Sequence, residues 1–358
     1  MKIIKKYILK EFLTIFFLTL LTLISVYLLI DFFERIGDLV KHHAPLSSIF
    51  QFFLFKLPFI IYTVAPFAVL FSTILSLGFL SRHMEIVAMR ASGISYLSIV
   101  KPVLLSSLLI AVFTFSINES IAPKTNRRVR ELKERWIRGK VQDSIFRQHK
   151  VWLKGKEGFF NITLIEPKEE VLKGFTLFQI GKDFSVSSRI DARTASWEEG
   201  RWNLKDAAIT NFSNDGSIKI TNYSEKSITL SKEFKDFQEM ERNADEIGFM
   251  ELWRYIDRLK MDGYEVVRYT VDLYSKLSLP FGAFVMAIIG IPFAMRRAEK
   301  GGALVGIGLS LILVFAFWIV TGITKAFGYG GVLPPFLAAW TPNLTFSILG
   351  MLMYTYIE

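Results

Sequence analysis

The sequence predicts an α-helical membrane protein in which six transmembrane helices, three before and three after an inserted polar segment, carry an antiparallel β domain. Two observations support this fold class. Six long runs contain no charged residue, and the polar segment between the third and fourth runs changes to an alternation of apolar and polar residues. We expect helices one to three in residues 1–122, the β domain with flanking helices in 123–265, and helices four to six in 266–358.

The six uncharged runs are each long enough to cross a hydrocarbon core of roughly 30 Å as a helix. They cover residues 12–30, 57–80, 102–118, 277–295, 301–324 and 326–357. Core helices of a large soluble protein would not supply six such runs. Lysines precede the first run as in a signal peptide, but this run is too long for one and no small-residue cleavage site follows it. We therefore expect a retained first span.

The short loops predict the orientation, because Lys and Arg collect on the cytoplasmic side of a membrane protein. Basic residues concentrate in the N-terminal tail and in the loops after the second and fourth spans: Lys2, Lys5, Lys6, Lys10, Arg82, Arg90, Lys101, Arg296, Arg297 and Lys300. Both termini are therefore predicted in the cytoplasm and the β domain outside. Basic flanks at an anionic membrane account for the net charge of +10, so no nucleic-acid partner is needed.

The polar segment alternates as half-buried strands do between about residues 142 and 230. Glu199-Gly200 and Asn214-Asp215-Gly216 have the composition of hairpin turns. We expect an antiparallel sandwich or jelly roll rather than a closed barrel. Residues 245–260 then return to helical spacing, which predicts an amphipathic helix lying at the membrane surface where the chain re-enters.

Several chemistries are excluded or disfavoured by composition. The absence of cysteine rules out thiol catalysis, and the four histidines lack metal-ligand spacing. No GxxxxGK[ST] motif exists, so the chain is not its own P-loop ATPase. Lys56, Lys276 and Lys325 border their spans and are expected to reach an interface, which disfavours an ion-coupled carrier. No catalytic residue, metal site or bound cofactor is expected.

The loop after the second span contains a segment with helical composition at about residues 82–93. Gly93 suits a left-handed C-terminal cap, and Ile86, Met89 and Arg90 share one face. From composition, this helix is either an ordinary interfacial loop helix or a docking element for a subunit that supplies energy.

With this segment the sequence resembles the LptF/LptG permeases of the lipopolysaccharide-export ABC transporter. The resemblance covers nearly the whole chain and is carried by EIVAMRASG at 85–93, NESIAP at 118–123, DLYSKLSLP at 272–280 and GIPFA at 290–294. The second motif is more similar to LptG than to LptF. The family implies a multi-pass protein of the bacterial inner membrane with a periplasmic jelly roll, paired with a second, LptF-like permease or with a copy of itself.

The resemblance also implies partners and residue roles. Two cytoplasmic LptB-like subunits would use ATP, and lipopolysaccharide would pass to LptC/LptA-like β jelly rolls. Glu85 would pair with a basic residue of the ATPase groove, with Ile86, Met89, Arg90 and Gly93 completing the coupling helix. LptG proteins place Lys at the outer end of span one, whereas this chain has Asp31 and Glu34. Of the basic residues there, only Arg35 and Lys41 remain as candidates to contact the glycolipid phosphates.

Two further features have both a structural and a functional interpretation. Lys124, Arg127, Arg128 and Arg135 fall near one face of a helix after span three, where they would contact either ordinary headgroups or glycolipid phosphates. Gly302 and Gly306 have GxxxG spacing, which marks close packing within or between subunits. For this glycine pair, the family resemblance favours packing between subunits, because spans one and five form the subunit contact and the lateral gate in that family.

Two other functions compete with a permease. One is a membrane-anchored scaffold or sensor with an external β domain, and the other is an intramembrane enzyme acting on a lipid-linked sugar. Copurification of an ATPase subunit separates the permease from both.

Overall fold

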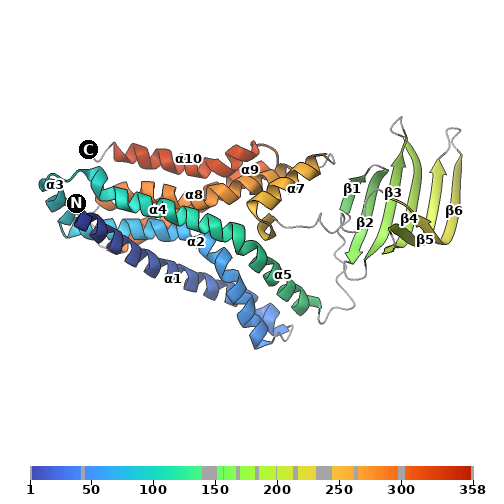
Figure 1. Cartoon of the computed structure of the whole chain (residues 1–358), viewed down its shortest axis with the longest axis horizontal. Helices are drawn as coiled ribbons and strands as arrows, with labels where there is room; N and C mark the ends of the chain where they lie inside the picture. Colours follow the sequence, from blue (N-terminus) through green and yellow to red (C-terminus); the bar gives the residue numbers. More distant parts are fainter. Residues whose placement is uncertain are drawn as a thin grey trace. The chain divides into compact units, whose positions relative to one another are not determined.

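A computed structural model describes residues 2–41, 45–138, 151–155, 157–166, 170–181, 185–198, 200–212, 217–230, 244–261, 265–296 and 303–355. These residues contain six helices long and apolar enough to cross a membrane, with the β strands between the third and the fourth (Figure 1). The predicted three-plus-three arrangement is confirmed.

The membrane bundle consists of α1 (Lys2–Lys41), α2 (Leu46–Arg82), α4 (Tyr96–Ser120), α8 (Val267–Arg296), α9 (Ala303–Tyr329) and α10 (Pro335–Tyr354). The short α3 (Glu85–Ala91) joins α2 to α4, and α5 (Ala122–Arg138) follows α4. The 3-10 turn η1 (Ala244–Glu246) and α7 (Phe249–Met261) precede α8. The helix predicted over 245–260 is thus a short turn followed by a true helix.

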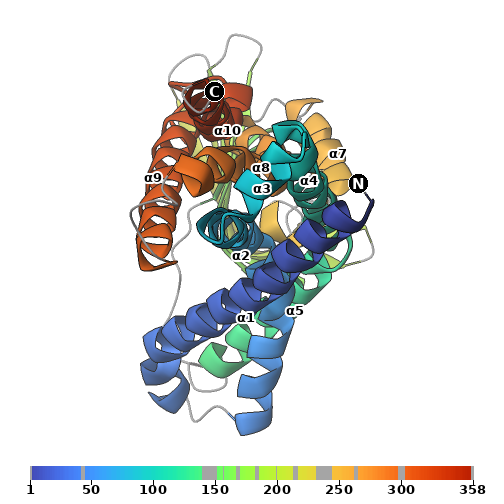
Figure 2. The same ribbon diagram turned by 90° about the vertical axis from the view of Figure 1, so that its left-hand side faces the viewer.

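The spans differ sharply in how far the rest of the chain covers them. Of the most apolar window of each helix, 83% of α2 and 67% of α8 are buried, against 6% of α1 and 17% of α9. Figure 2 shows α2 and α8 inside the bundle, with α1 and α9 at its periphery. Close packing at the centre uses small residues: a Cβ on Gly290 of α8 would lie 3.0 Å from Thr73 of α2. α1 and α9 therefore present most of the surface available to lipid or another subunit.

The β unit is one antiparallel sheet whose six strands are neighbours in sequence order. They are β1 (Val151–Gly155), β2 (Gly158–Glu166), β3 (Val171–Ile180), β4 (Val186–Glu198), β5 (Arg201–Phe212) and β6 (Ile218–Ile228). The predicted antiparallel domain and the hairpin at Gly200 are confirmed; the turn predicted at 214–216 lies outside the described residues. The described strands form a meander with one apolar core, rather than the two facing sheets of a sandwich. Strand periodicity predicts an apolar face but not what covers it.

The apolar face is kept along the strands by local changes of twist. Leu172 and Phe175 of β3 are both buried, as are Leu204 and Ala207 of β5, although an odd spacing would place each pair on opposite faces. Between them, Gly174 has φ +63° and Asp206 has φ +50°. These left-handed residues reverse the alternation, so the sheet bends while it keeps one apolar core.

Contacts group the described residues into two compact units. Of the described residues, one unit takes those within 2–138, 244–256 and 266–355, and the other those within 151–230 and 257–265. The basic helix α5 therefore packs as part of the membrane bundle, whereas the sequence suggested a boundary at residue 123.

Candidate functional site

The short helix α3 is fixed at both ends by its backbone. At its C-terminus, the Gly93 N–H donates to the Arg90 carbonyl at 2.9 Å and the Ile94 N–H to the Met89 carbonyl at 3.1 Å. Gly93 has φ +81°, so this is the left-handed cap that the sequence predicts. At the other end Met84 is also left-handed, with φ 59°, and breaks the chain away from α2.

The two faces of α3 differ from the sequence expectation. Ile86 is 5% exposed and lies in the bundle core, and Met89 packs against that core. The outward face consists of Met84, Val87 and Arg90, with Met84 65% and Val87 53% exposed. Ile86 and Met89 therefore anchor the helix, and the apolar surface free for a partner is one that sequence reasoning missed. Apolar residues on both sides of so short a helix do not indicate which side is buried.

Glu85, the expected partner of a basic ATPase residue, is half-buried. Its carboxylate lies beside the Tyr7 phenol of α1. The structure thus connects the first residue of α3 to the first span, and motion of one is expected to affect the other.

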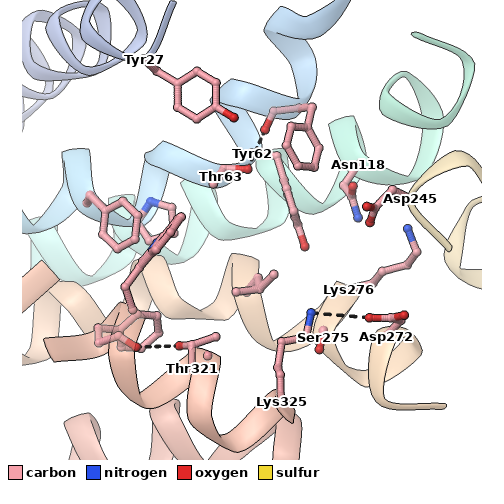
Figure 3. Close-up of a pocket in the computed structure, with 17 residues that line it drawn as sticks. Tyr27, Tyr62, Thr63, Asn118, Asp245, Asp272, Ser275, Lys276, Thr321 and Lys325 are labelled. Carbon is pink, nitrogen blue, oxygen red and sulfur yellow. Dashed lines mark hydrogen bonds and ion pairs between the residues drawn. The ribbon is translucent and has the colours of Figure 1, made fainter. Parts of the chain in front are cut away.

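At the opposite end of the bundle, a cavity of about 430 Å³ opens between α1, α2, α8 and α9 (Figure 3). Its wall is mostly aromatic and aliphatic, and its charged residues, Asp245, Asp272, Lys276 and Lys325, gather at one side (Figure 3). The lining residues are Tyr27, Phe59, Tyr62, Thr63, Pro66, Phe67, Asn118, Asp245, Asp272, Ser275, Lys276, Leu279, Phe317, Trp318, Thr321, Gly322 and Lys325. This pattern suits an amphiphile with a polar head.

The two lysines of the cavity are held differently. Lys325 Nζ lies 3.5 Å from Asp272 Oδ1, which also accepts a 2.5 Å hydrogen bond from the Tyr329 hydroxyl. Lys276 is 5% exposed, and no ion pair between described residues includes it. Its amine points toward Asn118 and Asp245 and away from the Lys325 pair (Figure 3). Lys276 therefore lies in the cavity wall with an acidic residue, Asp245, on the side that its amine faces.

The expectation that the border lysines reach an interface is wrong for Lys276 and Lys56. The Lys56 side chain is only 11% exposed, and its Nζ donates to Asp31 Oδ1 at 2.7 Å. Arg35 Nε donates to the same oxygen at 2.9 Å. The second carboxylate oxygen of Asp31 is buried and has no hydrogen-bond partner among the described residues. Neighbouring helices cover these two lysines, so their side chains do not extend to the membrane surface. A local sequence pattern contains no information about this burial.

This cluster changes the role of the residues that were expected to contact glycolipid phosphate near span one. Arg35 is paired with Asp31, which also binds Lys56, so Arg35 already has a partner within the chain. The side chain of Lys41 lies outside the described part. Lys56 also lies 5.6 Å from the ring centre of Tyr27, which connects the cluster to the cavity wall.

The basic residues of α5 divide into two groups. Arg127 Nε donates to the Glu246 carbonyl at 3.0 Å, and Arg130 Nη2 pairs with the Glu246 carboxylate at 3.0 Å. Lys124 and Arg128 are exposed, and Arg128 pairs with Glu131 one turn further along at 2.8 Å. The side chain of Arg135 lies outside the described part. Arg127 thus holds η1 in place, and Lys124 and Arg128 remain accessible.

Glu119, at the end of α4, binds the first residues of α7, where the chain re-enters the bundle. Its carboxylate accepts hydrogen bonds from the Phe249 and Met250 N–H groups, the two first residues of α7. A carboxylate is favourable there because the first N–H groups of a helix lack internal partners and carry partial positive charge. A Cβ on Gly248 would lie 2.8 Å from Glu119, so the glycine permits this approach.

Comparison with known proteins agrees with this architecture. The model of the family "Lipopolysaccharide export system permease LptF/LptG" matches residues 6–356. The chain is 23% identical to the lipopolysaccharide export system permease protein LptG of Escherichia coli (strain K12), over 98% of this chain and 97% of the relative. It is 24% identical to LptG of Haemophilus influenzae, over 96% of each. The chain belongs to the LptF/LptG permease family.

Within this LptF/LptG permease, the segments that carry the resemblance lie at the two ends of the bundle. Residues 85–93 form α3 and its cap, Asn118 and Glu119 border the cavity and α7, and Asp272 and Lys276 line the cavity. No group of acidic, histidine or cysteine residues suited to a metal ion occurs among the described residues.

The glycine pair of span five is only partly described. A Cβ on Gly306 would lie 3.1 Å from Ile74 Cγ2, so this glycine lets α9 approach α2 of the same chain. Gly302 lies outside the described residues. A role for this pair at a subunit interface stays a prediction.

Proposed function

We propose that this chain extracts lipopolysaccharide from the outer leaflet of the inner membrane as one permease of an ABC transporter. A second, LptF-like permease would complete the membrane unit, and two cytoplasmic LptB-like subunits would hydrolyse ATP. Both termini and α3 would face the cytoplasm. The β unit would lie in the periplasm and pass the glycolipid to LptC/LptA-like β jelly rolls.

The cavity of Figure 3 is the observation that carries this proposal. Lipopolysaccharide combines a charged head with many acyl chains, and the cavity combines a charged group, Lys276 and Lys325 beside Asp245 and Asp272, with an aromatic wall. At about 430 Å³ the cavity holds only part of such a molecule. Because α1 and α9 are the least covered spans, a second permease packed beside them would enlarge it.

Energy would enter through the outward face of α3. Met84 and Val87 offer an apolar contact, and Arg90 beside them offers a charged one. A short apolar and basic patch of this kind suits a groove on a partner protein. Since Ile86 lies in the core formed by α1, α2, α4 and α8, a displacement of α3 would be transmitted to these spans.

The β unit would transfer the acyl chains along its apolar face. β6 is an edge strand of the described sheet, and its Ile218 and Ile220 are 62% and 64% exposed. An exposed edge with apolar side chains is able to pair with a strand of another β domain, which would extend the apolar face.

A photo-crosslinking residue in place of Thr321 tests the proposal in the assembled transporter. Thr321 lines the cavity, so lipopolysaccharide should form an adduct there, detected by an antibody to the glycolipid. Ile348 of α10 is 57% exposed outside the cavity and serves as the matched position. Equal labelling at the two positions, or none at Thr321, would contradict the proposed function.

A further inference from the structure

We infer that the bundle also holds an anionic phospholipid, in a groove at the end where the chain begins. This second lipid site is separate from the proposed glycolipid cavity. It is lined by α1, α2 and α4 alone, whereas the cavity is also bordered by α8 and α9, and the two sites share no lining residue. The inference therefore does not depend on the substrate of the transporter.

The groove has a volume of about 700 Å³ and an almost entirely apolar wall. It is lined by Lys5, Lys6, Leu9, Leu13, Phe16, Phe17, Leu20, Ile61, Ala65, Lys101, Pro102, Leu105, Ser106, Leu109, Ile110, Phe113 and Thr114. The hydroxyls of Ser106 and Thr114 donate to carbonyls of their own helix, so they offer no free donor to the groove. The wall therefore suits hydrocarbon chains.

The length of the groove matches one leaflet. On α1 its apolar part runs from Leu9 to Leu20, which spans about 16 Å at the helical rise of 1.5 Å per residue. On α4 it runs from Pro102 to Thr114, or about 18 Å by the same rise. Half of a hydrocarbon core of roughly 30 Å is about 15 Å. A transmembrane helix of a partner would need twice this length, so an acyl chain is the better match.

Charge identifies the headgroup. Lys5, Lys6 and Lys101 stand at one end of the groove, because α1 and α4 both begin at this end of the bundle (Figure 1). All three are exposed, and no acidic residue is among the described residues that line the groove. Three amines around the mouth favour a phosphate without a compensating amine, as in phosphatidylglycerol, over the zwitterionic phosphatidylcholine.

The wall also explains why a lipid would remain bound between these helices. Ile61 and Ala65 of α2 form the floor, while Leu105, Leu109 and Phe113 of α4 are at least half exposed without an occupant. An acyl chain would cover these side chains from one side while the three lysines hold its headgroup.

The test uses the full chain in nanodiscs that contain equal amounts of phosphatidylglycerol and phosphatidylcholine, with a photoactivatable acyl chain on one lipid at a time. Labelled peptides are identified by mass spectrometry. Phosphatidylglycerol should label α1 and α4 within residues 9–20 and 102–114 more strongly than phosphatidylcholine. Each lysine near an anionic headgroup contributes about fivefold in affinity, so K5Q/K6Q/K101Q should weaken labelling at least about tenfold.

Two controls separate the groove from general electrostatic attraction. Lys10→Gln, Lys205→Gln and Lys219→Gln together remove the same charge at exposed positions outside the groove and should leave the labelling unchanged. Leu105→Trp with Leu109→Trp keeps the lysines but narrows the groove at exposed positions, and should abolish labelling. Equal labelling by the two lipids, or full labelling in either groove variant, would overturn the inference.

Discussion

The two ends of the membrane bundle differ in whether their charged side chains are exposed or buried. At the α3 end the buried anchor is the apolar Ile86, and Arg90 stays exposed. At the other end Asp31, Lys56 and Lys276 are withdrawn from solvent. Removing charges from water is costly, and pairing them often only offsets the cost. The α3 end therefore presents a surface that suits the proposed water-soluble partner, whereas the other end holds charge inside the helical bundle.

The largest expected effect is at the buried cluster of α1 and α2. Asp31→Asn should destabilise the chain by about 3–5 kcal/mol, because Lys56 and Arg35 lose their shared carboxylate while Lys56 stays buried. Thermal denaturation of the purified protein in detergent measures the loss.

Two variants test the cause of this loss. Asp31→Leu combined with Lys56→Met removes both buried charges and should recover most of the stability. Asp206→Asn breaks an exposed pair with Arg193 and should change little, since such pairs contribute about 0–1 kcal/mol. If Asp31→Asn is as stable as the parent, the buried charges at this end do not depend on their pairing, and the proposed difference between the two ends is contradicted.

The next effect separates the two faces of α3. Ile86→Ala should cost about 2–5 kcal/mol because it empties a buried site, whereas Val87→Ala should stay within about 0.5 kcal/mol. ATPase binding should instead depend on the exposed face. Val87→Asp should abolish copurification of the ATPase without loss of thermal stability. Normal ATPase binding by Val87→Asp would remove the assigned docking face.

A smaller effect is expected where α4 meets α7. Glu119→Gln keeps the shape of the side chain but removes the charge that accepts the Phe249 and Met250 N–H groups, at a cost of about 1.5–3 kcal/mol. Glu131→Gln on α5 is the matched change at an exposed carboxylate. The melting temperatures of the two variants should differ, and identical values would argue against the capping role.

The smallest effect is expected on the outer face of α5. Arg128→Ala breaks an exposed pair one turn apart and should change stability by at most about 0.5 kcal/mol. Arg127→Ala also removes a hydrogen bond to the Glu246 carbonyl and should cost about 1 kcal/mol. Glycolipid crosslinking should fall in Arg128→Ala more than in Arg127→Ala if the exposed arginine contacts phosphate. The opposite order would show that Arg127 leaves η1 to bind the glycolipid.

Local patterns in the sequence predict much of this fold. Uncharged runs predict the six spans, alternation predicts the strands, and the Gly93 cap follows from the need for a left-handed residue after α3. The face on which α3 packs and the burial of Lys56 and Lys276 depend on helices distant in sequence. Composition therefore did not show that Ile86 and Met89 pack against the bundle, and it assigned two buried lysines to an interface.

In the proposed function, ATP acting at the α3 end moves glycolipid that is held in the cavity. The most direct measurement is lipopolysaccharide crosslinking at Thr321 in the full transporter, before and after ATP is added, for the parent and for Arg90→Glu on the outward face of α3. ATP should deplete the adduct in the parent but not in Arg90→Glu, in which the cavity itself is unchanged. Depletion to the same extent in both, or an adduct in the parent that ATP does not alter, would contradict the proposed function.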